Sequence, residues 1–175
     1  ETLTSIVTIP LFFVENTLTL YFILTLFKLG ISKKLKILYV FTLSLSGIIT
    51  NNLIPTPINV ILNYCITIIV IYLIFSMGKT KTLIATILPI IIFTLLSNLI
   101  SNPYMSLLGI NSDDLLNIPI YRIIYLFIVY TIMFLIIFIL KHNKFSMTLL
   151  NNLSRKNSSI ILINILLGFF AIIMQ

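Results

Sequence analysis

Few side chains in this sequence have the chemistry of a catalytic group. The one cysteine, Cys65, and the one histidine, His142, are the only pair that resembles the nucleophile and base of a cysteine hydrolase. Each lies in or beside a long apolar segment, and these segments place the two residues near opposite faces of a membrane. In a hydrocarbon core of about 30 Å they are separated by about 20 Å, which is beyond hydrogen-bond reach. We therefore expect no hydrolase.

The adjacent acids Asp113 and Asp114 are the next candidates. No second acidic cluster and no group of histidines accompanies them. The run Asn111-Ser-Asp-Asp is instead typical of a helix amino terminus, in which a capping side chain is followed by acids in the first turn. We interpret it as a cap. For this segment we predict no catalytic residues, no metal and no cofactor.

The composition indicates which elements position these residues. Of the 175 residues, 59% are hydrophobic and 9% are charged, and the mean hydropathy is +1.19. The predicted fold class is an all-α membrane protein, a bundle of about six transmembrane helices that forms a single domain over residues 1–175. The six spans are expected at Leu3–Phe27, Leu35–Leu53, Ile58–Ser76, Leu83–Ile100, Ile120–Leu140 and from Ser159 to the end.

The basic residues predict how the bundle is oriented. Ten of the eleven lie in three loops on one side of the membrane, and the exception is Arg122. Basic loops stay in the cytoplasm, so we expect a multi-pass protein of the cell membrane with its amino terminus outside. Their position beside the spans also accounts for the net charge of +7 without a nucleic-acid partner. The basic loop residues are Lys28, Lys33, Lys34, Lys36, Lys79, Lys81, Lys141, Lys144, Arg155 and Lys156.

Glu15 is the acidic residue that lies inside a predicted span, and Asn16 follows it. An ionised carboxylate in hydrocarbon is costly, so this side chain requires a partner or a polar cavity. Two interpretations remain open. Glu15 and Asn16 form an intramembrane polar switch or a counter-charge for a ligand, or Glu15 is a neutral acid that ties helices together.

The stretch Asn98–Arg122 is the longest predicted interruption on the outer side. Apolar side chains, an acidic pair and one arginine occur together there, flanked by tyrosines and asparagines near the outer helix ends. A hydrophobic peptide that partitions into the outer leaflet would find apolar contacts and hydrogen-bond partners at this level. The candidate ligand-binding residues are Asn63, Asn98, Tyr104, Met105, Leu107, Leu108, Asp113, Asp114, Tyr121, Arg122 and Tyr125.

Three phrases in this order carry a family resemblance: the turn IPTPIN, the fourth span KTKTLIATILPIIIF and the segment NIPIYRIIYLFIVY. With this layout of spans the chain resembles the amino-terminal transmembrane sensor region of Agr-type quorum-sensing histidine kinases, the GHKL-kinase group of Gram-positive bacteria. The resemblance covers nearly the whole chain. It implies a membrane receptor that binds an extracellular peptide pheromone, often a cyclic thiolactone, and relays the signal to a cytoplasmic histidine kinase.

The resemblance also implies partners besides the lipid bilayer. The kinase of this family is dimeric and acts on a response regulator, and it would follow a seventh span beyond Gln175; no kinase motif occurs in the sequence itself. A second hypothesis is the substrate-binding membrane subunit of a vitamin-type uptake transporter, which the chain length and span number fit equally well. Two features argue against it: the sequence has only five glycines, and before the sixth span it shows no small-xxx-small face of the kind used to dock a partner subunit.

Overall fold

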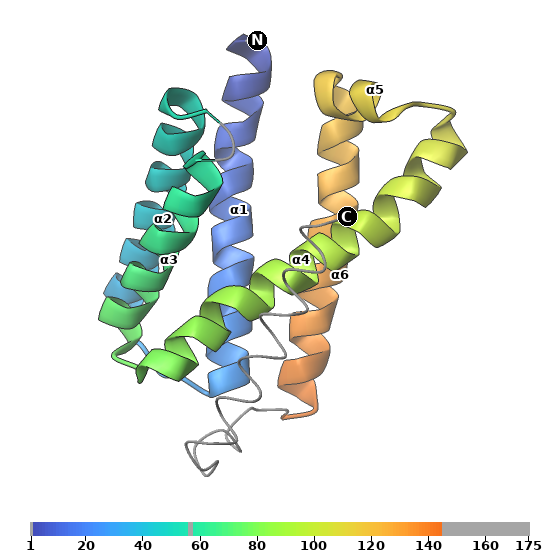
Figure 1. Ribbon diagram of the computed structural model, residues 1–175. Helices are drawn as coiled ribbons and strands as arrows, with labels where there is room; N and C mark the ends of the chain where they lie inside the picture. Colours follow the sequence, from blue (N-terminus) through green and yellow to red (C-terminus); the bar gives the residue numbers. More distant parts are fainter. Residues whose placement is uncertain (1, 56–57, 145–175) are drawn as a thin grey trace.

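A computed structural model describes residues 2–55 and 58–144, and the structural statements below refer to these residues. Six helices follow one another in this part of the chain, and it contains no strand (Figure 1). They are α1 (Thr2–Phe27), α2 (Lys33–Leu53), α3 (Ile58–Phe75), α4 (Lys79–Leu108), α5 (Ser112–Asn117) and α6 (Pro119–His142). The sixth predicted span, from Ser159 onward, lies outside the described residues.

Local signals explain where the helices begin and end. Ser32 caps α2 by accepting a hydrogen bond from the backbone N–H of Leu35 at 3.4 Å. Pro119 occupies the first turn of α6, where its missing N–H costs nothing. Gly109 ends α4 in the left-handed conformation, with φ of 65°. The first, second, third and fifth predicted spans have bounds within two residues of those of α1, α2, α3 and α6. The apolar runs and these local signals therefore end at nearly the same residues.

The fourth helix differs from its prediction. The expected span ended at Ile100, whereas α4 continues to Leu108 and contains both Pro89 and Pro103. A proline inside a helix removes one backbone hydrogen bond, but packing can offset that loss, and Tyr104 beside Pro103 is buried. Most of the stretch that we expected to be a loop is therefore helical.

Four of the helices are long and apolar enough to cross a membrane: Ile9–Phe27 within α1, then α3, α4 and α6. The helix α2 is of similar length, but its lysines, serines, threonines and asparagines make it more polar, and it is not among the four. The chain is thus helical and has the character of a membrane protein. The number of spans and their orientation remain predictions.

The helix α1 lies in the middle of the bundle and packs against α2, α4 and α6, while α3 packs on α2 and α4. The helix α4 crosses the bundle diagonally, from the end of α3 to the opposite end, where α5 and α6 meet (Figure 1). One apolar core joins α1, α2 and α3 around Ile23, Tyr39 and Ile71. A second joins α1 and α6 around Phe22 and Met133.

The two ends of the bundle differ in charge. The ends of α1, α3 and α6 and the starts of α2 and α4 lie together at one end, and the end of α2 and the start of α3 lie with α5 at the other (Figure 1). All eight described lysines belong to the first group, which we call the lysine end. The opposite end, which carries Asp113 and Asp114, is called the loop end.

Candidate functional site

Two of the predicted ligand-binding tyrosines connect α4 to α6 at the loop end. The hydroxyl of Tyr104 donates a hydrogen bond to the backbone carbonyl of Tyr121 at 3.0 Å, and the hydroxyl of Tyr125 donates to the carbonyl of Ser97 at 2.9 Å. The rings of Tyr104 and Tyr125 lie against each other with their centroids 5.9 Å apart. These tyrosines therefore act as a clamp between the two helices.

The apolar residues beside this clamp are more accessible. Leu107 is 85% exposed and Leu108 is also exposed, whereas Met105 is half-buried. Asn98 is exposed and follows Ser97, whose carbonyl accepts the hydrogen bond of Tyr125. The end of α4 thus presents an apolar surface that either a lipid or a hydrophobic ligand could cover.

The acidic pair has the local role that its sequence context predicts. Asn111 accepts a hydrogen bond from the backbone N–H of Asp114 at 2.8 Å, and Asp114 accepts one from the backbone N–H of Asn111 at 3.2 Å. This reciprocal arrangement is a capping box at the start of α5. Asp113 stays exposed, so of the two it is the carboxylate whose oxygens are available to a ligand.

Asn63 does not join the other predicted ligand-binding residues. Its side-chain oxygen accepts a hydrogen bond from the hydroxyl of Thr50 at 2.9 Å, which ties α3 to α2. One turn nearer the loop end, Asn59 donates to the side chain of Asn51 at 3.1 Å and ties the same two helices. The polar stripe on α3 is therefore engaged in helix packing.

Glu15 and Asn16 are neighbours in sequence but contact different helices. The side-chain amide of Asn16 donates to the carbonyl of Phe12 at 2.9 Å and to the hydroxyl of Ser44 on α2 at 3.2 Å. Glu15 is directed to the other side of α1, where it is hydrogen-bonded to Tyr130 of α6. The two side chains therefore face different helices, and their role as an intramembrane switch stays a prediction.

Glu15, Tyr64 and Tyr130 together make what we call the mid-membrane cluster. They come from α1, α3 and α6, and Tyr64 lies within electrostatic range of Glu15. From Glu15 to the end of α1, and from Tyr130 to the end of α6, is twelve residues, or about 18 Å, so both lie near the middle of the bundle. Although Glu15 lies deep among the helices, its side chain is exposed. The described residues leave the space in front of it uncovered.

Polar residues of α6 lie between the loop end and the mid-membrane cluster. Arg122 and Tyr125 both lie within electrostatic range of Tyr130. Arg122 is half-buried, and Tyr125 also belongs to the clamp. Polar groups on α6 therefore continue from the loop end toward Glu15.

Tyr64 and Tyr130 are absent from the predicted site, although the sequence contains a signal for them. Tyr64 is eleven residues before the end of its helix, while Glu15 and Tyr130 are each twelve before the ends of theirs. In helices that end at the same membrane face, such spacing places side chains at the same depth. Ranking polar residues by depth would have grouped these three.

The remaining reactive side chains lie apart. Cys65 is exposed in the loop-end half of α3, and His142 is at the lysine end of α6, where its ring stacks near that of Phe138 at 6.3 Å. Among the described residues, no three of the histidine, cysteine and acidic side chains are grouped so that they could hold a metal ion.

No family of known proteins, no curated protein and no solved structure matches this chain. The resemblance to the sensor kinases therefore rests on the three sequence phrases and the span layout alone.

Proposed function

We propose that this chain is the membrane-embedded sensor part of a receptor for a small extracellular molecule. The resemblance to Agr-type sensor regions favours a small peptide, often cyclic, as that molecule, with a cytoplasmic histidine kinase as the recipient of the signal. The single observation that carries the proposal is the position of Glu15, an acidic residue in the middle of a long apolar helix. It is exposed as a residue, and its carboxyl group is hydrogen-bonded to Tyr130 of α6.

The chemistry of this cluster suits a ligand that donates hydrogen bonds. A carboxyl group accepts hydrogen bonds from peptide N–H groups or pairs with an ammonium group, and in surroundings of low polarity such contacts are strong. The apolar surface of Leu107 and Leu108 would contact apolar side chains of the same ligand. An ionisable group in the middle of a span is expensive, and such residues commonly mark functional sites.

Signal relay requires that the ligand favours one of two arrangements of the helices. Glu15 and Tyr130 connect α1 to α6 through a single hydrogen bond. A ligand that competes for Glu15 would weaken this connection and favour an arrangement in which α6 is displaced relative to α1. Because α6 continues to the lysine end, the displacement would reach the cytoplasmic side of the predicted topology.

The test measures binding to the purified chain in lipid nanodiscs. The probes are synthetic thiolactone peptides with apolar side chains and, in parallel, water-soluble vitamins, and binding is detected as a rise in the unfolding temperature. Peptide binding is expected. With Glu15→Gln the affinity should fall about 10- to 100-fold, since a hydrogen bond to a charged group is worth about 1.5–3 kcal/mol.

The matched control is Thr131→Val. Thr131 neighbours Tyr130 but is exposed, and its hydroxyl donates to the carbonyl of Phe127 in its own helix at 2.7 Å. This variant should bind the peptides normally. Equal loss in both variants, or peptide binding that Glu15→Gln leaves unchanged, would remove the mid-membrane cluster from the site. Binding of a vitamin and of no peptide would favour the transporter subunit instead, since transporter sites also lie near the bilayer midplane.

A further inference from the structure

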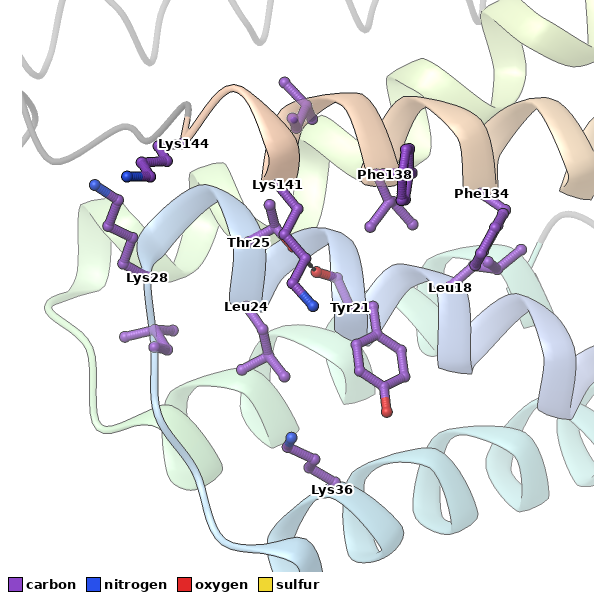
Figure 2. A pocket seen from close by; sticks show the side chains of 13 residues that line it. Leu18, Tyr21, Leu24, Thr25, Lys28, Lys36, Phe134, Phe138, Lys141 and Lys144 are labelled. Carbon is purple, nitrogen blue, oxygen red and sulfur yellow. Dashed lines mark hydrogen bonds between the residues drawn. The ribbon is translucent and has the colours of Figure 1, made fainter.

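A cavity of ≈ 630 Å³ opens between α1, α2 and α6 at the lysine end, on the opposite side of the mid-membrane cluster from the loop end (Figure 2). Its walls have two parts. Apolar and aromatic side chains line the deeper part, and lysines surround the part near the helix ends. The lining residues are Leu18, Tyr21, Leu24, Thr25, Lys28, Leu29, Lys36, Phe134, Ile137, Phe138, Leu140, Lys141 and Lys144.

The lysines of this cavity come from separate elements. Lys28 and Lys144 follow the ends of α1 and α6, and Figure 2 shows Lys36 of α2 and Lys141 of α6 pointing toward the space between them. The ammonium group of Lys36 lies over the ring of Tyr21, 5.7 Å from its centroid. Four like charges around one cavity repel one another unless an anion lies between them.

The described part of the chain has no acidic residue near these lysines. Its acidic residues are Glu15, Asp113 and Asp114, and none of them is at the lysine end. Residues 145–175 include no acidic residue and add Arg155 and Lys156 to the positive charge. Lys36 is also in the first turn of α2, where the helix dipole disfavours a cation. The compensating charge must therefore come from another molecule.

The apolar part of the cavity has the length of a lipid chain. From Lys28 to Leu18 along α1, and from Lys144 to Phe134 along α6, is ten residues, or about 15 Å. This equals about half of a hydrocarbon core of about 30 Å, the depth of one leaflet. A soluble anion such as free phosphate would use the lysines and leave this apolar wall without a partner.

We propose that the cavity binds one anionic phospholipid of the leaflet that the lysine end faces. The phosphate lies among Lys28, Lys36, Lys141 and Lys144, and an acyl chain lies along Leu18, Leu24, Phe134 and Phe138. Basic pockets between spanning helices are a known setting for anionic headgroups. The lipid would bridge α1, α2 and α6 at the end where α6 would pass a signal on, so the lipid composition would set how freely α6 moves.

The experiment uses the purified chain in a neutral detergent and native mass spectrometry. Phosphatidylglycerol and phosphatidylcholine with identical acyl chains are titrated separately. The expected result is one tightly retained phosphatidylglycerol, with phosphatidylcholine bound at least tenfold more weakly. Equal retention of the two lipids would overturn the proposal.

Two double variants locate the site. Lys36→Gln/Lys141→Gln removes two charges from the cavity, and at about 1 kcal/mol for each lysine it should weaken phosphatidylglycerol binding about 30-fold. Lys33→Gln/Lys34→Gln removes the same charge from exposed lysines of α2 outside the cavity and should change binding less than threefold. If both double variants lost the same affinity for phosphatidylglycerol, the lipid would be attracted to the basic surface in general and the cavity would not be a specific site.

A third variant tests the apolar wall. Leu24→Glu places a negative charge on the path of the apolar acyl chain, and it should abolish retention of the single phosphatidylglycerol. Inorganic phosphate in large excess over the lipid is expected not to displace it. Displacement by phosphate alone, or unchanged lipid binding in the Leu24 variant, would show that the cavity takes a soluble anion.

Discussion

At the scale of single residues, several polar side chains of the spans hold helices together, and Glu15, the acid of the described spans, also remains accessible. Tyr104, Tyr125 and Asn63 all have partners on neighbouring helices. Glu15 has a partner too, but its side chain is exposed. Polar residues in spans are expensive and need partners. The exception is therefore the residue at which a ligand is most expected.

Tyr104 offers a direct test of the clamp. In Tyr104→Phe the ring remains, but the hydrogen bond to the carbonyl of Tyr121 is lost, and the free energy of unfolding should fall by about 1 kcal/mol. The measurement is an unfolding titration of the purified chain in mixed micelles.

The control for this variant is Tyr72→Phe on α3. Tyr72 is exposed, and its hydroxyl has no hydrogen-bond partner within the described ranges. Its removal should change the free energy of unfolding by less than half a kcal/mol, the usual range for surface positions. If the two variants lost the same stability, the bond between α4 and α6 would not be what stabilises the loop end.

At the scale of elements, α1 and α2 approach closely through small residues on α2. Ser44 and Gly47 are buried, and the hydroxyl of Ser44 donates to the carbonyl of Phe12 at 3.2 Å. A Cβ at Gly47 would lie 3.1 Å from the ring of Phe12. These small residues are used for packing within the chain, so they do not form a face that docks a partner subunit.

A large side chain at Gly47 should separate these two helices. Gly47→Leu has no room beside Phe12, and we expect it to lower the free energy of unfolding by about 1–3 kcal/mol through overpacking. The readout is the same micelle titration. Gly30→Leu is the matched control, because nothing lies within 4 Å of a Cβ at Gly30 and its φ is not in the left-handed region. A Gly47 variant as stable as the Gly30 variant would contradict the close contact.

At the scale of the whole molecule, the structure separates two surfaces by charge and by depth. The loop end and the lysine-lined cavity are at opposite ends of the bundle, and the mid-membrane cluster lies between them near its middle. Whichever way the bundle faces, a ligand at the loop end and a lipid among the lysines would therefore approach from opposite faces of the membrane. The orientation of the bundle in the membrane decides whether the loop end or the lysine end is extracellular.

Labelling of single cysteines tests the orientation. In a Cys65→Ala background, Ser112→Cys is at the loop end and Lys34→Cys is at the lysine end, and both positions are exposed. Because basic loops stay in the cytoplasm, an impermeant maleimide added to intact cells should label position 112 and not position 34. Permeabilised cells serve as the control, since both positions should then react. Labelling of position 34 alone in intact cells would reverse the orientation and contradict an extracellular ligand at the loop end.

The sequence by itself determined the features that depend on local chemistry. Hydropathy placed α1, α2, α3 and α6, and the capping box at Asn111 and Asp114 could be predicted because its partners are three residues apart. The separation of the lysines from the acidic loop also follows from where the spans end. These features require only the backbone and near neighbours.

The tertiary structure decided which side chains meet across helices. The contact between Glu15 and Tyr130 and the contact between Asn63 and Thr50 both depend on how each helix is rotated about its axis. In lipid that rotation is set by packing over many residues. The continuation of α4 past Pro103 depends likewise on the clamp to α6. The lysine-lined cavity has no sequence signature at all, because its walls come from α1, α2 and α6 and exist only where these three helices diverge.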